Sequence, residues 1–286
     1  RPYLESQLLY KDAMTYRVNL FRLFIARAVA LVRPGGAQSY IVPMALLGDR
    51  FTFELRERLL DSTDFEGIEA FPQKDDPNDR VFRDAKLPTC VYALRARQPQ
   101  SSFRVRTHPG RHIGSDSPSY VTSTADLALF EPVFRTIPLL DARAYRLVMK
   151  LATDPRLSRI GEIAHTLSGE IVFNASFRKY LSEDPSQTLV LRGGHVQRYE
   201  MIEDPKQGSP VYIDRAKWMS DSGPGTAAYA HMAPRIVYQE CAALDNWRRV
   251  IATLLPAGRV CGHTICYCQE VVYDLNAFLA VFNSTL

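Results

Sequence analysis

The sequence contains no apolar run near the roughly 20 residues that a membrane-spanning helix requires, and no segment with the pattern of a secretory signal. Cysteine is scarce and odd in number, with five in 286 residues. This usage disfavours a disulfide framework and fits a reducing compartment. We therefore expect a cytoplasmic protein without a membrane partner.

A strong excess of charge of one sign is also missing, because the formal net charge is only +4 and no basic block stands out. Such a mild excess permits nucleic-acid binding without indicating it. The sequence also lacks a Gly-Lys-Ser/Thr phosphate loop, a readable Ser–His–Asp or Cys–His arrangement and a Pro-Asp…Glu-x-Lys nuclease motif. We therefore expect no catalytic residue of these enzyme classes in the segment.

The residues that are present, 46% hydrophobic and 23% charged, are typical of a globular protein with real cores. Apolar residues at helical spacing predict a helix that ends at Pro-Gly-Gly, residues 34–36. Three arginines lie mostly outside the apolar face of this helix. The face comprises Val18, Phe21, Ile25, Ala28, Val29 and Val32; the arginines are Arg17, Arg22 and Arg33.

Alternating and continuous apolar runs predict the elements that follow. Residues 39–42 read as a strand of the type buried in a parallel sheet, and Asp49 is the expected N-cap of a helix over 50–60. Strands are predicted at 68–71 and 87–94. Since no helix joins these two, we expect an antiparallel pair at a sheet edge.

The texture changes after a polar boundary at 98–102. One strand at 103–106 and helices at 125–135 and 141–152 are predicted. From Ile160 onward, short apolar pieces with turn signals indicate a mixed or mostly β region, closed by a helix over 275–282.

Six short motifs in the first 97 residues follow one another in a fixed order: NLFRLFI (19–25), LVRPGG (31–36), SYIVP (39–43), LRERLL (55–60), VFRDA (81–85) and TCVYAL (89–94). Together they resemble the catalytic domain of adenine-specific, amino-methylating DNA methyltransferases, in particular the Type IIG restriction–modification family and its stand-alone relatives. The resemblance implies that residues 1–97 form the C-terminal half of a Rossmann-like α/β methyltransferase sheet. It implies methyl transfer from S-adenosylmethionine to an adenine extruded from the duplex.

A second series of motifs follows: IGEI (160–163), LSGEI (167–171), LVLRGGHVQRY (189–199), RIVYQE (235–240), NWRRVIA (246–252) and LAVFNSTL (279–286). These resemble the target-recognition domain that comes next in the same family. Residues 151–286 are therefore expected to form an α+β domain that binds double-stranded DNA and reads its sequence. Residues 98–150 are expected to be a linker and helical connector.

Two hallmarks of the family are absent from the sequence. It has neither the glycine loop that cradles S-adenosylmethionine after a first strand nor the Asn-Pro-Pro-aromatic tetrad that holds the target amino group. We therefore expect a fragment or one half of a split enzyme. Its partner would be the missing N-terminal half of the methyltransferase domain, and the strand at 39–42 would expose its edge without it. A nuclease domain or subunit is a further partner that the resemblance leaves open.

Phe82 matches the position at which the family places an aromatic ring against the extruded adenine, and the alternative is a core phenylalanine at a strand end. No metal is expected. The loop with Asp75, Asp76 and Asp79 is interpreted as solvated, because this methyl transfer needs no metal. The cysteine-rich stretch 261–268 is interpreted as a buried strand rather than a zinc site.

The Arg-Gly-Gly-His run at 192–195 is the most informative stretch of the second half. Two glycines let backbone amides approach a phosphate or base edge, and an arginine fork suits guanine in the major groove. The expected DNA-binding residues are Arg192, Gly193, Gly194, His195, Arg198, Arg248 and Arg249. A glycine-rich β-turn with exposed charges and a solvated helix face are the alternatives.

The leading hypothesis is that the chain is part of a DNA adenine-N6 methyltransferase in restriction–modification or phage defence. Residues 1–97 would form a wall of the adenine pocket, and residues 151–286 would read the DNA sequence. The fragment alone should be inactive. A non-enzymatic DNA-specificity subunit is the second hypothesis, although such a reader has no use for residues 1–97. An RNA or protein methyltransferase is the third, and the motifs after Ile160 speak against it.

Overall fold

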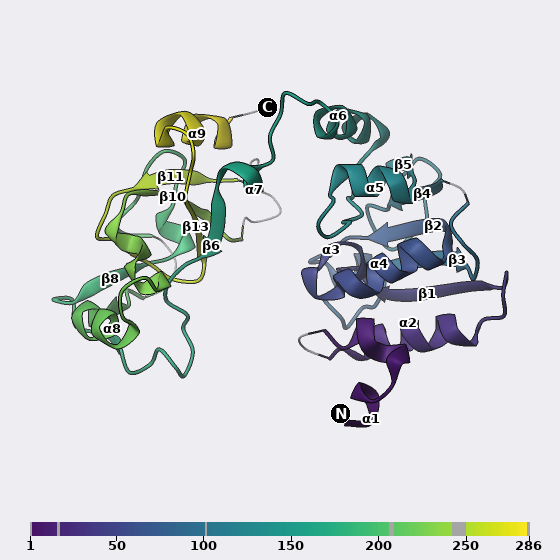
Figure 1. Ribbon diagram of the computed structural model, residues 1–286, viewed down its shortest axis with the longest axis horizontal. Coiled ribbons are helices and arrows are strands. Elements are labelled where there is room, and N and C mark those ends of the chain that lie inside the picture. The colour runs from purple at the N-terminus through teal and green to yellow at the C-terminus, as the bar shows by residue number, and fades with distance from the viewer. Residues whose placement is uncertain (1, 16–17, 101, 206–208, 242–249, 285–286) are drawn as a thin grey trace. The chain divides into compact units, whose positions relative to one another are not determined.

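In the computed structural model, five strands of the N-terminal part join into one sheet (Figure 1). The structure describes residues 2–15, 18–100, 102–205, 209–241 and 250–284. The chain divides into two compact units, Arg1–Leu157 and Ser158–Leu286. The strands of the first unit are β1 (Ala37–Pro43), β2 (Asp64–Phe71), β3 (Thr89–Arg95), β4 (Phe103–Thr107) and β5 (Ser119–Thr122), in the order β1-β3-β2-β4-β5.

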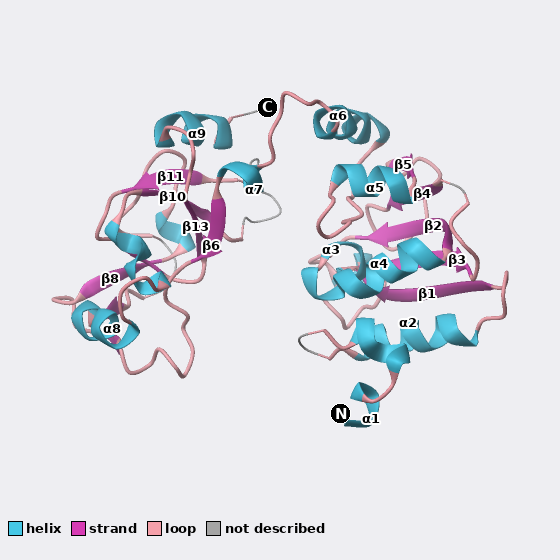
Figure 2. Cartoon of the chain, viewed as in Figure 1, coloured by secondary structure: helices cyan, strands magenta, loops and turns pink. Residues whose placement is uncertain are grey.

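Helices of different lengths accompany this sheet in the first unit (Figure 2). They are α1 (Pro2–Glu5), η1 (Leu8–Ala13), α2 (Leu20–Leu31), α3 (Ala45–Gly48), η2 (Arg50–Thr52), α4 (Phe53–Ser62), η3 (Pro77–Asp79), α5 (Thr124–Phe130) and α6 (Ala142–Ala152). Asp49 begins the η2–α4 segment by accepting a hydrogen bond from Phe51 N at 2.7 Å, which confirms the predicted cap. Within the described residues, no helix is long and apolar enough to cross a membrane.

The predicted antiparallel pairing of β2 with β3 is confirmed, but its predicted place at a sheet edge is wrong. β3 lies between β1 and β2 and pairs antiparallel with both. The physical reason is that the short connection fixes only the β2–β3 pair, whereas the other edge of β3 is free to bond to β1. The strand predicted at 39–42 is also not a buried parallel one, because β1 is the end strand and is mostly exposed.

The buried face of α2 differs from the predicted one. Arg22 is 2% exposed and packs inward beside Leu23 and Ile25, whereas Val18, on the predicted face, is 36% exposed. Arg22 can be buried because its Nη1 donates to the Thr15 carbonyl at 3.1 Å and to the Phe51 carbonyl. A charge satisfied in this way costs much less to bury than an isolated one. The buried face of α2 can therefore include Arg22.

Two four-stranded sheets form the second unit, which agrees with the β texture predicted from Ile160 onward. The antiparallel sheet has the order β11-β10-β13-β6, and the mixed sheet has the order β12-β8-β9-β7. The elements are α7 (Ile160–Ile163), β6 (His165–Ser168), β7 (Leu181–Ser182), β8 (Thr188–Leu191), η4 (Gly193–His195), β9 (Tyr212–Ile213), α8 (Arg215–Ser222), η5 (Ala227–Met232), β10 (Arg235–Gln239), β11 (Ala252–Leu255), β12 (Val260–Cys261), β13 (Ile265–Gln269) and α9 (Leu275–Phe282).

Two of the sequence motifs meet in a buried ion pair of this unit. Glu170 and Arg235 have side chains that are 0% and 3% exposed, and Arg235 Nη2 donates to Glu170 Oε1. The other carboxylate oxygen accepts from Cys261 N at 2.7 Å. The neighbouring Gly169 has no room for a side chain, because a Cβ there would lie 2.2 Å from the Gly262 carbonyl oxygen. Both motifs are therefore explained by packing between strands.

Candidate nucleic-acid interface

Three strands of the first sheet end at the same side of the sheet. β1 and β2 both run antiparallel to β3, and β4 runs parallel to β2. The carboxyl ends of β1, β2 and β4 therefore point the same way. In open α/β sheets, ligands bind outside the carboxyl ends of the strands. The segments that leave there, residues 72–88 and 108–118, form the candidate surface of the first unit.

Phe82 lies in the first of these segments and is 50% exposed. The segment is folded back by Arg80, whose Nε donates to the Lys74 carbonyl at 2.9 Å. A core phenylalanine does not fit this exposure. A half-exposed ring on a loop held by hydrogen bonds is available to stack against a flat base. The role of Phe82 stays a prediction, and its side chain is accessible for that role.

A buried histidine braces the second segment, and the sequence analysis missed it. His108 is 0% exposed; its Nε2 lies 2.6 Å from Glu69 Oε2 and its Nδ1 lies 2.8 Å from Ser117 Oγ. The ring also stacks on Phe71 with centroids 4.9 Å apart. These contacts fix both ends of the loop that carries the exposed Arg111. A lone histidine directly after a strand, followed by a Gly- and Ser-rich loop, was the available signal.

A cavity of about 540 Å³ lies beside the carboxyl end of β1. It is lined by Val18, Asn19, Phe21, Arg22, Ala45, Asp49, Phe51 and Thr52. Two of its polar groups are already engaged, because Arg22 donates to backbone carbonyls and Asp49 caps η2. The cavity has the size of a small-molecule site, and its lining residues Ala45 and Asp49 follow the carboxyl end of β1.

In the second unit, the Arg-Gly-Gly-His run forms the tight turn η4. Gly193 N donates to Thr264 Oγ1 at 3.0 Å, and a Cβ at Gly193 would lie 2.9 Å from the Thr264 carbonyl oxygen. His195 is 5% exposed, and its Nδ1 accepts from Arg192 N at 3.0 Å. Gly193 and His195 therefore hold the turn, while Gly194 is exposed on it.

The arginines predicted to bind DNA are placed differently from one another. The guanidinium of Arg192 lies over the Phe173 ring at 4.9 Å, and its Nε is buried. Arg198 is exposed; it lies over the Tyr199 ring at 5.0 Å and donates to the Asn283 carbonyl at 3.2 Å. Arg248 and Arg249 lie outside the described residues.

The buried histidines make the second unit sensitive to acid. Burial lowers the pKa of His195, and burial together with the nearby Arg215 charge lowers the pKa of His231. The unfolded chain takes up these protons near pH 6.5, before the folded chain does. The free energy of unfolding is therefore expected to fall as the pH drops below about 6.5, by up to about 1.4 kcal/mol per pH unit for each group.

Trp218 reports on this change, because it is 2% exposed and stacks on His231 at 5.8 Å. Urea unfolding followed by its fluorescence, in a Trp247→Phe background, should show a smaller loss between pH 6.5 and 5 in a His231→Gln variant. Glutamine still accepts a hydrogen bond from Arg215 Nε, which lies 2.8 Å from His231 Nε2. An unchanged pH dependence in His231→Gln would contradict the assignment.

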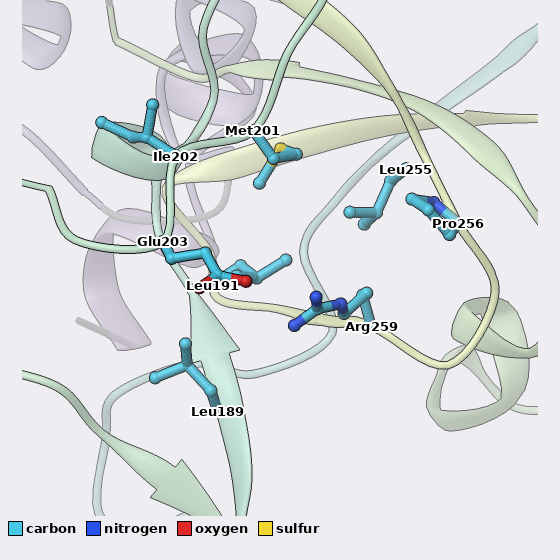
Figure 3. Close-up of a pocket in the computed structure, with 8 residues that line it drawn as sticks. All are labelled: Leu189, Leu191, Met201, Ile202, Glu203, Leu255, Pro256 and Arg259. Carbon is cyan, nitrogen blue, oxygen red and sulfur yellow. The ribbon is translucent and has the colours of Figure 1, made fainter.

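A second cavity, of about 440 Å³, lies beside β8 (Figure 3). Its lining residues are Leu189, Leu191, Met201, Ile202, Glu203, Leu255, Pro256 and Arg259. Six of these are apolar, and the two charged ones have opposite signs. A smaller cavity shares Leu189 and Glu203 with it and is also lined by Arg192 and His195. The turn of the Arg-Gly-Gly-His run and the larger cavity therefore belong to one continuous surface.

The acidic and cysteine-rich stretches serve the fold. Asp75 pairs with Lys86 at 2.5 Å, and Asp76 accepts a hydrogen bond from Asn78 N. Cys261 and Cys268 are buried in β12 and β13, so the prediction of a buried strand over 261–268 is confirmed in part: two strands lie there, and the chain turns between them. Across the described ranges, no group of three or more His, Cys, Asp or Glu side chains could hold a metal ion.

No protein-family model and no curated protein sequence matches the chain. Among solved structures, the Type IIL restriction–modification enzyme MmeI in complex with DNA is matched over 100% of this chain and 40% of its own, with a TM-score of 0.53 and 8% identity. The Type IIG restriction endonuclease BpuSI is matched over 99% and 41%, with a TM-score of 0.40 and 11% identity. A Type I methyltransferase subunit from Streptococcus thermophilus is matched over 47% and 33%, with a TM-score of 0.35 and 10% identity.

The chain thus spans less than half the length of each of these three proteins. The match to MmeI extends across both units of this chain. At 8% identity it is a likeness of fold. Over its whole length the chain has the fold of part of a restriction–modification enzyme, which confirms at the level of the fold the family resemblance found in the sequence.

Proposed function

We propose that the chain forms part of a site-specific DNA adenine-N6 methyltransferase of a restriction–modification or related phage-defence system. The fold that it shares, over its whole length, with a restriction–modification enzyme solved in complex with DNA is the main support. The first unit would supply one wall of the pocket for an extruded adenine, through Phe82. The second unit would read the DNA sequence, with Arg198 and Gly194 as the exposed members of the predicted set.

The proposal includes a second polypeptide segment that completes the first sheet. β1 is the end strand of that sheet in the described part of the chain, and Ile41 on it is 43% exposed. On α2, Leu20 and Phe24 are 68% and 65% exposed. A strand edge beside exposed apolar side chains favours association with another chain segment. We propose that the N-terminal half of the methyltransferase domain pairs with β1 and covers α2.

The residues of this chain do not fit S-adenosylmethionine. After β1, β2 and β4 the chain continues as Met44-Ala45, Pro72-Gln73 and His108-Pro109, without a glycine turn leading into a helix. The carboxylate of the cofactor would find no backbone cradle there. We therefore assign the cofactor to the partner half, and this chain contributes base stacking and DNA contacts only.

The lack of a cofactor cradle is also the observation that favours the alternative, a non-enzymatic DNA-specificity subunit. The two proposals differ in what the first unit does. In a specificity subunit, substitutions in the Phe82 segment would leave methylation by the separate catalytic chain unchanged. In the methyltransferase they would slow it.

Selection from a random duplex library tests DNA recognition by the full chain. At about 0.15 M salt we expect one recurrent motif that contains an adenine. An Arg198→Ala variant should lose part of the preference or, if Arg198 contacts phosphate, weaken binding to all sequences alike. Recovery of no motif, or equal retention of RNA and DNA, would contradict the proposal.

The Phe82→Ala substitution tests the methyltransferase role. In cells that express the complete methyltransferase gene, sequencing should detect N6-methyladenine at the selected motif. Loss of one stacking contact is expected to lower the methylation rate by roughly 5- to 150-fold, whereas Phe82→Trp should retain most of it. Val133→Ala, at a 60% exposed site away from this segment, is the matched control. A rate in Phe82→Ala equal to that of the control would assign Phe82 no part in the pocket.

A further inference from the structure

We propose that the 440 Å³ cavity of the second unit is a binding site for a guanine base. The site is distinct from the pocket for the methylated adenine, which belongs to the first unit. The cavity alone carries the proposal, whereas the idea that the base comes from a DNA duplex rests on the proposed function. Its volume lies within the usual range for small-ligand sites, about 300–1,000 Å³.

The walls of the cavity are apolar and the two polar groups oppose each other. Leu191 and Leu255 are 4% and 1% exposed and form firm walls. The Glu203 carboxylate and the Arg259 guanidinium reach into the cavity from opposite sides (Figure 3). Among the residues that the structure describes, neither side chain forms an ion pair within 4.0 Å. A ligand can therefore engage both charges at once.

This arrangement selects a flat ligand with two adjacent donors and, on the opposite part of the ring, acceptors. Guanine offers N1–H and N2–H side by side, which suit both oxygens of a carboxylate, and it offers O6 and N7, which suit an arginine fork. Adenine and cytosine each present one amino group beside a ring-nitrogen acceptor that a carboxylate repels. Thymine places its single donor between two acceptors. Guanine is thus the base that satisfies Glu203 and Arg259 together.

The backbone on both sides of the cavity is held in place. Ile202 N donates to the His195 carbonyl at 2.9 Å, which ties the Glu203 side to the Arg-Gly-Gly-His turn. The Arg259 carbonyl accepts from Arg235 Nη2 at 3.1 Å. Next to it, Gly258 has a φ of +89° that favours glycine, and its N–H donates to the His231 carbonyl at 2.7 Å. Preorganised walls of this kind lower the cost of ordering on binding.

Isothermal titration of the full chain with guanosine monophosphate tests the site without DNA. We expect guanosine monophosphate to bind more tightly than adenosine or cytidine monophosphate by roughly 5- to 150-fold, the discrimination of one bidentate pair. Inosine monophosphate lacks the N2 amino group and should bind with intermediate affinity. Equal affinities for the four nucleotides, or no binding of any, would overturn the proposal.

Variants assign the contacts. Glu203→Gln and Arg259→Met should each remove most of the guanine preference, because each removes one of the two paired contacts. Both side chains are exposed enough for the fold to survive. Glu200→Gln changes an exposed carboxylate that does not line the cavity and should leave binding unchanged. A Leu189→Trp substitution, which fills the cavity, should abolish binding; binding retained in Leu189→Trp would place the nucleotide elsewhere.

A duplex experiment identifies the source of the base. Each guanine of the selected DNA motif is replaced in turn by inosine, and the affinity is compared for the unmodified chain and Glu203→Gln. If the site takes a base from the duplex, inosine at one position lowers the affinity of the unmodified chain for DNA but not that of Glu203→Gln. Guanosine monophosphate then also competes with the duplex. If the site takes a free nucleotide, the monophosphate binds without such effects. DNA binding without any guanine preference at the cavity would refute the site and leave the proposed function intact.

Discussion

Replacing Glu170 with glutamine is expected to lower the free energy of unfolding of the second unit by about 3–5 kcal/mol, the cost of leaving one partner of a buried ion pair uncompensated. The Arg235 guanidinium would keep its charge in a site where both side chains are at most 3% exposed. Its other contacts are the carbonyls of Arg259 at 3.1 Å and Ala230 at 3.5 Å, Cys261 Sγ at 3.5 Å and the Tyr267 ring at 5.1 Å, and none of these groups neutralises that charge.

Urea unfolding followed by Trp218 fluorescence measures this loss, again with Trp247→Phe. The matched control is Lys179→Met, which breaks the exposed Lys179–Asp221 pair (3.0 Å) of the same unit and should cost far less, because exposed ion pairs contribute little to stability. A Glu170→Gln/Arg235→Met double variant should regain much of the stability, because glutamine can still accept from Cys261 N and no unpaired charge remains. If the single and the double variant are equally unstable, the ion pair is not the cause.

Sequence reasoning located the elements that are specified locally. The last helix was predicted over 275–282 and is found as Leu275–Phe282, with Asp274 capping its first turn at 3.0 and 2.9 Å. Asp49 and the strand predicted over 87–94, which is found as Thr89–Arg95, were located for the same reason: the cap or the apolar run lies within a few residues of the element it defines.

The order of the strands was not predictable in this way, because strand pairing is set by distant residues. β3 could be recognised as a strand from its own residues, but its position between β1 and β2 depends on pairs such as Tyr40 with Tyr92 and Ile68 with Tyr92. Chain connectivity predicts the β2–β3 pair, but it does not specify which strand bonds to the other edge of β3.

The candidate site was predicted in part for a related reason. Residue types pointed to Phe82 and to the Arg-Gly-Gly-His turn, but not to which side chains reach the surface. His195 is buried by its contact with Arg192 N, and Gly193 faces Thr264 across 71 positions of sequence. The cavity that holds Glu203 opposite Arg259 joins segments more than fifty positions apart in the sequence, so no spacing rule could have found it.

The role of Arg56 also depends on residues that are distant in the sequence, and the second prediction with a large expected effect concerns this side chain. It is 1% exposed, and its Nη1 donates to the carbonyls of Leu46 and Asp49 at 3.0 and 3.1 Å. Its Nε and Nη2 donate to the Phe134 carbonyl at 3.1 and 2.6 Å. Burial lowers the pKa of the guanidinium to about 10, so it stays charged at neutral pH. One side chain thus ties α3 and the start of η2 to residues 134–135.

An Arg56→Met substitution is therefore expected to destabilise the first unit by at least about 3 kcal/mol, because several buried carbonyls lose their donor at once and each such loss costs about 1–3 kcal/mol. Arg56→Lys should be intermediate, since an ammonium lacks the planar fork that reaches both sides. Hydrogen exchange should show faster opening of β2 and β3 with β10 unchanged, and DNA binding by the second unit should persist. Arg58→Met is the control, because this side chain is partly exposed, pairs with Asp12 at 3.5 Å and donates to only one carbonyl in the described contacts, that of Leu9 at 3.1 Å. A loss as large as that of Arg56→Met would mean that the number of buried carbonyl contacts does not account for the role of Arg56.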